Sequence, residues 1–352
     1  MKAEIWHIIG KGFHFGRHGL GQEESGIHLT SDTLFAALVS RLAEVQGSAA
    51  VQPWMDQFIQ SPPLFVLSSA FPRAGEVRFF PVPLGRLEKK NDGGKEEVHM
   101  KTLKRVRYVS EKTFQKIIAG ESLNSLIQSG CLLQGGQVLL VKEEMPLLPK
   151  KIAAEEQPIW QVNTRPRVTI GRVDSTSNIF FTGWTAFNQD CGLWFGVRWL
   201  RESDEAKKTL ATLLADLGTA GIGGDRSSGF GDALFEKQAA GCMLPDAAAS
   251  RWVTLSHYLP AQDENNALLD KQAAYSLETV GGWIYSPASK NQRRISVRML
   301  AEGSVFGSLE KDVPGQLVDV QPVYEGLKPL GHPVWRNGQA FAVGLNTGKE
   351  EA

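Results

Sequence analysis

The sequence predicts an α+β protein of two units, the first of which opens in the strand and helix order of a ferredoxin-like βαββαβ fold. A β-rich segment at residues 3–9 precedes a helix with one apolar face at residues 31–46. A second helix, at 202–217, leads through a glycine-rich loop into a strand at 234–235. An alanine-rich polar stretch at 239–251 then marks a domain boundary, and mainly short strands follow it.

The composition limits the classes of protein to consider. At 352 residues the chain can form two domains, and its 38 Lys and Arg balance its 38 Asp and Glu, so any site for nucleic acid must be local. Cys131, Cys191 and Cys242 lack paired spacing, which argues against a zinc site or a disulfide framework and favours a reducing cytoplasm. The N-terminal residues show no long apolar run, so neither a signal peptide nor a membrane span is expected.

The first helix is defined by its apolar spacing. Its apolar face recurs at helical intervals and consists of Leu34, Phe35, Leu38, Val39 and Leu42. Ser31 or Asp32 is expected to cap its N-terminus. Asp32 could also be a catalytic acid, but capping is the preferred interpretation.

A strongly charged segment interrupts the strands that follow. Strands are expected at 64–70 and 77–82, separated by a break at 71–73. Residues 85–107 hold eight Lys or Arg and four Asp or Glu, a composition typical of a solvated face, and the basic end at 101–107 could also line a phosphate track. One or two helices at 110–127 are expected to follow, and then a strand at 138–141.

Three arginines with no intervening acid predict a basic hairpin. Arg165, Arg167 and Arg172 lie within eight residues, and the alternation at 167–170 suits a half-buried strand. A turn at 174–177 leads into the returning strand, and another strand is expected at 193–197. Because surface arginines are common on strands, a purely structural role remains open.

The glycine-rich loop at 221–231 (GIGGDRSSGFG) has five glycines in eleven residues. Its backbone N–H groups, Arg226, Ser227 and Ser228 could together bind phosphate oxygens. A tight connection that needs glycine only for its turns is an equally good interpretation. The loop matches neither a P-loop, a dinucleotide fingerprint nor a Gly-x-Ser-x-Gly elbow.

A second glycine-spaced loop follows the first strand, at 12–21. Its phenylalanines alternate with His14, Arg17 and His18, a pattern that suits base stacking together with phosphate contact. Aromatic side chains that simply pack at the end of a strand explain the pattern equally well. The two histidines are weak candidates for a metal pair, so no metal is expected.

The second unit is expected to be mainly β. The predicted strands are 252–259, 275–277, 283–285, 295–300, 317–320 and 340–345. A basic run at 290–294 lies in a stretch, 286–301, that has no acidic residue.

Several motifs resemble the RAMP proteins of CRISPR effectors. In the first unit these are residues 12–16 (GFHFG), 31–35 (SDTLF), 167–170 (RVTI), 177–181 (SNIFF) and the glycine-rich loop. In the second unit, residues 281–286 (GGWIYS), 302–306 (EGSVF) and 332–338 (HPVWRNG) are similar to one branch, the fourth subunit of the type III-A (Csm) interference complex.

The resemblance implies two ferredoxin-like (RRM-like) units, at 1–240 and 250–352, with elaborated insertions and a β-hairpin thumb. It implies a non-catalytic subunit without cofactor, which caps the 5′ handle of the guide RNA (crRNA) in antiviral defence. The partners would be the large polymerase/cyclase-like subunit, a neighbouring backbone RAMP subunit and target RNA near the thumb. The thumb would be residues 165–181 or, as second choice, 86–107.

The residue chemistry and the resemblance together predict an RNA-binding set of basic, glycine and small polar residues. This set is His14, Phe15, Gly16, Arg17, Ser31, Lys101, Lys104, Arg165, Arg167, Arg172, Gly221, Gly223, Gly224, Asp225, Arg226, Ser227, Ser228, Gly229, Lys290 and Arg293. The alternatives are an endoribonuclease with His14 as acid or base, the equivalent type III-B subunit, and a scaffold that binds only protein.

Overall fold

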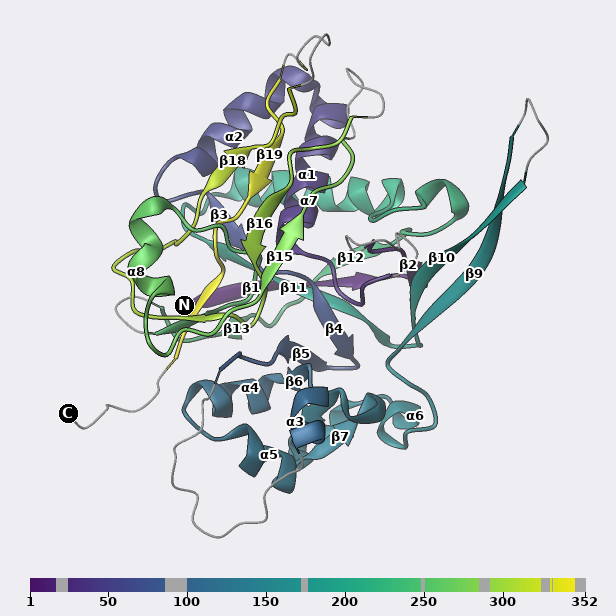
Figure 1. The fold of residues 1–352 in the computed structure, drawn as a ribbon, viewed down its shortest axis with the longest axis vertical. Helices are drawn as coiled ribbons and strands as arrows, with labels where there is room; N and C mark the ends of the chain where they lie inside the picture. Colours follow the sequence, from purple (N-terminus) through teal and green to yellow (C-terminus); the bar gives the residue numbers. More distant parts are fainter. Residues whose placement is uncertain are drawn as a thin grey trace.

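A computed structural model of the chain (Figure 1) describes residues 1–16, 25–85, 100–171, 177–247, 251–284, 292–323, 330 and 332–345. Among these residues no helix is long and apolar enough to cross a membrane.

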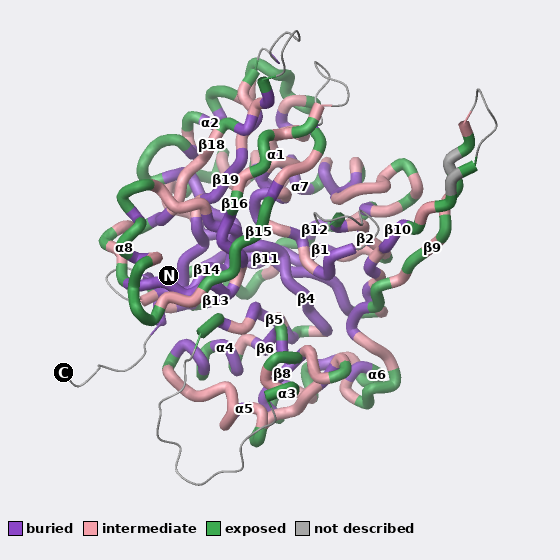
Figure 2. The backbone as a smooth tube through the Cα atoms, in the orientation of Figure 1, coloured by how far each residue is buried: buried purple, intermediate pink, exposed green. Residues whose placement is uncertain are grey.

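The centre of the molecule is one large, mostly antiparallel sheet. Strand β1 (Lys2–Ile9) lies between β12 (Leu234–Lys237) and β11 (Cys191–Trp199), and β11 pairs in turn with β4 (Phe71–Ala74). Strand β3 (Phe65–Leu67) pairs with the other end of β11. Consecutive residues of β3, β4 and β11 are buried, so both faces of these strands contribute to the core, drawn in purple in Figure 2.

Two helices complete this unit. Helix α1 (Ser31–Gln46) follows β1 and precedes β3, while α7 (Asp204–Ala220) connects β11 to β12. The side chain of Arg41 in α1 forms an ion pair with Asp216 of α7, and both helices bury their leucine-rich faces. The helices expected at 31–46 and 202–217 are thus present as α1 and α7 beside the large sheet.

The start of α1 differs from the prediction. Thr30, not Ser31 or Asp32, is the N-cap: its backbone is extended and its carbonyl accepts the first helical hydrogen bond, from the N–H of Leu34 at 3.0 Å. Ser31 and Asp32 lie in the first turn and are buried.

The break expected at residues 71–73 is also wrong, because these residues belong to β4. A proline fits there because Pro72 pairs only with β11, whereas β5 (Val77–Pro81) pairs with β4 from Arg73 onward.

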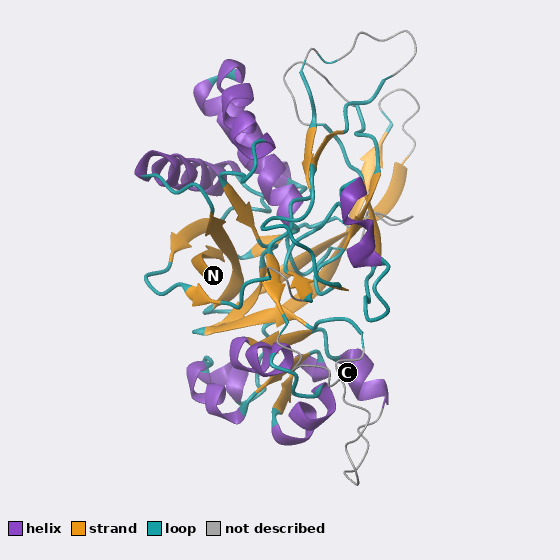
Figure 3. Ribbon diagram, turned by 90° about the vertical axis from the view of Figure 1, so that its left-hand side faces the viewer, coloured by secondary structure: helices purple, strands orange, loops and turns teal. Residues whose placement is uncertain are grey.

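A long insertion between β4 and β11 extends the sheet and adds a helical lobe, seen beneath the sheet in Figures 1 and 3. Its remaining strands are β6 (Tyr108–Ser110), β7 (Cys131–Leu133) and β8 (Val138–Leu140). Its helices are α3 (Met100–Arg105), α4 (Glu111–Ile118), α5 (Leu123–Ser129) and α6 (Lys150–Ala153), with short 3₁₀ turns at Gln134–Gly136 and Lys142–Leu147. Of the one or two helices expected at 110–127, the structure has two, α4 and α5.

The predicted basic hairpin is confirmed. Strands β9 (Trp160–Ile170) and β10 (Ser177–Phe187) pair along their whole length, and β2 (Gly12–Phe13) pairs with the base of β10. The hairpin extends away from the body of the molecule (Figure 1), and its outer half is mostly exposed (Figure 2).

The second unit lacks the predicted βαββαβ order among its described residues. It has three small sheets: β17-β14-β20 (Val305–Phe306, Trp252–Thr254, Ala342–Gly344), β15-β16 (Leu277–Val280, Val297–Leu300) and β18-β19 (Leu317–Asp319, Trp335–Asn337). Its described helical parts are a 3₁₀ turn at Gln262–Glu264 and the four-residue α8 (Asn265–Leu268). The described part of the chain places no strand at 283–284, where one was expected.

In its described residues, the second unit has no long helix to cover its sheets, so its apolar side chains pack against the first unit instead. Val253, Leu255, Phe341 and Val343 belong to the same hydrophobic cluster as the first unit, and β19 packs against α1. The remaining elements lie at the edges of the first unit: α2 (Val51–Ile59), a 3₁₀ turn at Ser48–Ala50 and β13 (Cys242–Met243), which pairs with β1.

The shared core predicts that both units unfold together. Phe341 is fully buried, and its ring lies 3.4 Å from where a Cβ on Gly196 of β11 would stand. We expect Phe341→Ala to lower the free energy of unfolding by about 3–5 kcal/mol in a single urea transition. The exposed Leu269 provides the control, since Leu269→Ala should change stability by less than about 0.5 kcal/mol. Two separate transitions, of which only one moved, would contradict the shared core.

Candidate nucleic-acid interface

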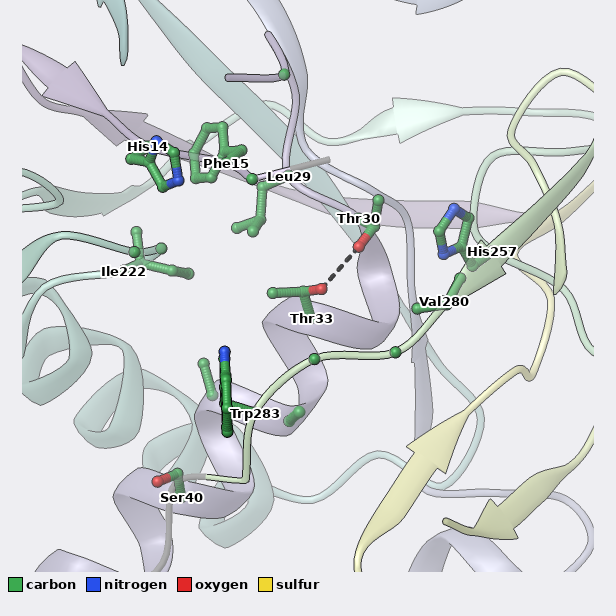
Figure 4. Close-up of a pocket in the computed structure, with 18 of the residues that line it drawn as sticks. His14, Phe15, Leu29, Thr30, Thr33, Ser40, Ile222, His257, Val280 and Trp283 are labelled. Carbon is green, nitrogen blue, oxygen red and sulfur yellow. Dashed lines mark hydrogen bonds between the residues drawn. The ribbon is translucent and has the colours of Figure 1, made fainter. Parts of the chain in front are cut away.

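A groove of about 830 Å³ lies between the two units (Figure 4). Four segments line it: the outer face of α1, residues 14–16 at the end of β2, the start of the glycine-rich loop and residues 277–283 of the second unit. Four arginines (Arg41, Arg226, Arg294 and Arg336) line the groove, against two carboxylates (Glu44 and Glu278). Two of these arginines are paired within the protein, Arg41 with Asp216 and Glu44, and Arg336 with the buried Asp32.

The glycine-rich loop forms one wall by packing tightly on the end of β2. The N–H groups of Gly224 and Gly231 donate to the carbonyls of His14 and Gly12 at 2.8 and 3.0 Å. Gly223 has φ +92°, and a Cβ there would lie 2.6 Å from the carbonyl oxygen of His14. The glycines are thus needed for close approach of two backbones.

This packing changes the predicted phosphate cradle. Much of the loop's backbone donates within the protein, through the N–H groups of Gly221, Ile222, Gly224, Ser228, Gly229 and Gly231. The interpretation of the loop as a tight connection is therefore largely right. An anion at this wall would have to be bound mainly by side chains, of which Arg226 lines the groove.

The loop also anchors the hairpin. Arg167 of β9 donates to the Asp225 carboxylate at 2.8 Å and to the Ser228 hydroxyl at 2.5 Å. Because Arg167 and Asp225 neutralise each other, the structure assigns both a role in fixing the hairpin rather than in free phosphate contact. Ser227 and Gly229 lie exposed beside this pair.

A second contact fixes the same joint. The guanidinium of Arg165 stacks on the Phe230 ring, 4.6 Å from its centroid, and Phe230 stacks in turn on Trp184 of β10 at 5.5 Å. Arg165 thereby supports the hairpin.

The two predicted residues after β2 have different environments. His14 is half-buried at the groove and donates from Nδ1 to the carbonyl of Gly183 at 2.6 Å, which leaves Nε2 as its second polar atom. Phe15 is only 8% exposed and stacks on Phe13 at 5.2 Å, because residues two apart on an extended chain share a face. Phe15 is therefore core, and its predicted role in base stacking is wrong. Gly16 is exposed at the groove.

Ser31 also belongs to the interior. Its hydroxyl accepts from the N–H of His257 at 3.0 Å, and its own N–H donates to Ser69 at 2.9 Å. It joins α1 to the second unit and is not a surface ligand, so the prediction of RNA contact at Ser31 is corrected.

The other predicted residues do not gather at the groove. Lys101 and Lys104 are exposed on α3, in the helical lobe, which lies apart from the groove (Figure 1). Arg293 is exposed beside residues 277–284. Arg17, Arg172 and Lys290 lie outside the described residues, as do His18 and most of the 86–107 segment.

A buried charge cluster forms the floor of the groove and connects the two units. The Asp32 carboxylate, fully buried in α1, accepts from His257 Nδ1 at 2.8 Å and from the guanidinium of Arg336 in β19. His257 Nε2 lies 3.5 Å from Glu278 and 3.8 Å from Glu302, and Glu302 also accepts from the hydroxyl of Ser69.

The cluster shifts the protonation of its members. Burial alone would raise the pKa of Asp32, but Arg336 and His257 outweigh burial and hold it far below its ordinary value. Burial also acts to raise the pKa of Glu302, yet His257 and His28 lower it to about 2. Burial would lower the pKa of His257, but Glu302 and Asp32 hold it well above its ordinary value. The cluster is thus ionised throughout at neutral pH.

Sequence reasoning missed this cluster. Asp32, Glu302 and Arg336 lie in motifs that carried the family resemblance, but nothing local indicates that they meet. The available signal was Asp32 itself, because an acid in the first turn of a helix with an apolar face needs a partner of opposite charge if it is buried. Within the described part of the chain, no group of three or more His, Cys, Asp or Glu residues could hold a metal ion.

The fold thus combines one large mixed sheet, a glycine-rich loop after α7 and a projecting hairpin, which together carry the motifs that resemble RAMP proteins. Residues 247–345 match the family described as the CRISPR Csm4 C-terminal domain. The chain is 27% identical to the CRISPR system Cms protein Csm4 of Thermococcus onnurineus (strain NA1), over 90% of this chain and 91% of that protein. It is 27% identical to the protein of that name from Mycobacterium tuberculosis (strain ATCC 25618 / H37Rv), over 94% and 97%. The chain is thus similar to Csm4 proteins over nearly its whole length, as its motifs indicated.

Solved structures share the fold. A crystal structure of a Csm3-Csm4 subcomplex in the type III-A CRISPR-Cas interference complex contains a chain that matches with TM-score 0.62 and 16% identity, covering 98% of this chain and 100% of that one. A Csm1-Csm4 cassette in complex with pppApA contains one that matches with TM-score 0.57 and 20% identity, over the full length of both chains.

The buried position of Asp32 predicts a large effect of its neutralisation. Asp32→Asn should lower the free energy of unfolding by about 3–5 kcal/mol, because it leaves Arg336 buried without its counter-charge. Urea denaturation measures this. The matched control is Asp263→Asn, in an exposed pair with Lys311 at 3.4 Å, which should cost less than about 1 kcal/mol. Equal effects of the two substitutions would show that the cluster adds no stability.

The cluster also predicts a pH dependence with a defined sign. Since the folded chain raises the pKa of His257, its stabilisation is complete below about pH 6.5 and is lost as the pH rises through the folded value. Asp32 and Glu302 behave oppositely: their stabilisation is complete above their ordinary pKa values of 3.8 and 4.5 and is lost as the pH falls through the folded ones.

We therefore expect the free energy of unfolding of the unsubstituted chain to fall above pH 6.5 by up to about 1.4 kcal/mol per pH unit. His257→Gln should abolish this dependence on pH. Urea midpoints at a series of pH values measure both slopes. Identical slopes above pH 6.5 would exclude His257 as the titrating group.

Proposed function

We propose that this protein is the non-catalytic guide-RNA-binding subunit of a type III-A CRISPR interference complex, and that it holds the 5′ repeat-derived handle of the guide RNA in the groove. The observation that carries the proposal is the groove itself, because it lies between the glycine-rich loop and the second unit and is lined by more cations than acids. Single-stranded RNA is bound through phosphate contacts and unstacked bases, which a groove lined by arginines between two units can accommodate.

The hairpin at 160–187 is proposed as the thumb. It extends away from the body of the molecule (Figure 1), and the contacts of Arg165 and Arg167 with the glycine-rich loop hold it partway along its length. Val168 and its cross-strand partner Ile179 are exposed on one face, with Ile170 and Phe181 beside them. Such an apolar face suits insertion between bases where the guide meets target RNA. The alternative thumb at 86–107 lies mostly outside the described residues.

We further propose that the chain bridges the large polymerase/cyclase-like subunit and a backbone RAMP subunit. The fold is shared with structures in which a Csm4 protein is joined to Csm1 or to Csm3. Of the two units, only the first is proposed to be ferredoxin-like, because its strand order is β12-β1-β11-β4. Helix α1 lies between β1 and β4 in the chain, and these strands lie on either side of β11. Helix α7 connects β11 to β12, and these strands lie on either side of β1.

The endoribonuclease alternative rests on His14, whose imidazole borders the groove. Both proposals can be tested in one experiment. The purified chain is incubated with an end-labelled guide precursor, with and without divalent metal, and is then analysed by gel shift and on a denaturing gel. Binding that requires the 5′ handle without cutting supports the capping subunit. Cutting that vanishes in His14→Ala would overturn it.

Arg226 provides a specific prediction for the same assay. Arg226→Ala should weaken binding of the handle by about 1–3 kcal/mol, roughly 5- to 150-fold in Kd, because a charged donor to phosphate is lost. The control is Lys208→Ala, which removes an exposed cation on α7 that does not line the groove. An equal loss in both variants would show that the effect is not specific to the groove.

A further inference from the structure

Trp283 is an exposed aromatic side chain at the edge of the groove. Its side chain is 53% exposed and lines the groove, at the end of the segment that begins at Val280 (Figure 4). A single exposed aromatic side chain is ordinary on a protein surface, but this one lines a groove between two units, where a ligand can reach it.

The backbone around Trp283 is held in place. Trp283 forms a β-bridge with Arg293, and hydrogen bonds of 2.9 Å connect Ile284 N–H to the Gln292 carbonyl and Arg294 N–H to the Gly282 carbonyl. The backbone on both sides of the indole is therefore hydrogen-bonded to residues 292–294.

One face of the indole is already occupied. The Arg293 guanidinium lies over the ring, 4.6 Å from its centroid. Arg293 does not line the groove, whereas Trp283 and Arg294 do. The arginine thus holds the ring on one face, which lowers the cost of ordering it when a partner stacks on the other.

The wall of the groove that α1 forms carries several small side chains. The residues of α1 that line it include Thr33, Ala36, Ala37 and Ser40, which recur at helical spacing and are all small. Among the Phe, Tyr and Trp side chains that line the groove in the described chain, Phe15 is stacked in the core, and Trp283 is the exposed one.

The geometry points to Trp283 as a stacking platform that holds one unpaired base of the RNA between the indole and α1. This inference rests on the proposed function and deepens it, since it assigns the base-stacking role, which the sequence placed at Phe15, to the second unit. Stacking of this kind recognises the flat face of a base and discriminates little between bases.

A double-mutant cycle with abasic RNA tests the inference. The probe is a fluorescein-labelled single-stranded RNA of the 5′ handle, together with versions that lack one base at each successive position. Affinities are measured by fluorescence anisotropy for the full chain and for Trp283→Ala, Trp283→Phe and Tyr275→Ala. Tyr275 is the matched control, because it is an exposed aromatic side chain of the second unit that does not line the groove.

We expect Trp283→Ala to weaken binding of the intact RNA about 5- to 100-fold and Trp283→Phe to keep most of the affinity. One abasic position should weaken binding to the unsubstituted chain by a similar factor and have no further effect in Trp283→Ala. Tyr275→Ala should bind as the unsubstituted chain does.

Two negative results are distinguishable. If the full chain binds the handle, but every abasic RNA loses the same factor in both the unsubstituted chain and Trp283→Ala, the platform is wrong and the proposed function stands. If the folded full chain does not bind the handle at all, both are wrong. Trp283→Phe keeps the test decisive should Trp283→Ala unfold.

Discussion

The buried pairing of Asp32 with Arg336 and His257 is the interaction on which the rest of the structure depends. It connects the first turn of α1 to two segments of the second unit, 225 and 304 residues away along the chain. An isolated charge at this depth would be strongly unfavourable, so each partner is stable only when the others are in place. The second unit is therefore docked in one orientation, and the groove between the units keeps one shape.

The walls of the groove follow from the same docking. Ser31 and Ser69 bind groups of the second unit beside the charge cluster, so α1 presents its outer face to residues 277–283. Opposite, the glycine-rich loop is held against the end of β2 by backbone hydrogen bonds that only glycine permits at Gly223. Both walls are thus set by buried backbone and polar contacts, and the exposed groups between them are left for a ligand.

The hairpin shows how groups that look functional can serve structure. Arg165 and Arg167 occur in a run without acids, as in a nucleic-acid site, yet both are engaged within the hairpin by Phe230 and Asp225. These contacts tie the orientation of the hairpin to the glycine-rich loop. A rigid connection between the groove and the hairpin would hold a guide strand in one path from the groove to the hairpin. The proposed function requires such a path.

The sequence by itself determined the local elements: the helices at 31–46 and 204–220, the hairpin strands and the glycine-rich loop, because periodicity and turn chemistry depend on near neighbours. It could not determine the burial of Phe15 or the pairing of Arg167 with Asp225, since each depends on residues brought in from elsewhere. For the same reason the sequence did not indicate that the described strands of the second unit form three small sheets, which pack partly against α1 and the core of the first unit. Only the tertiary structure decided that Asp32 meets Arg336 and that Trp283 faces a groove, because long-range pairing leaves no local pattern in the chain.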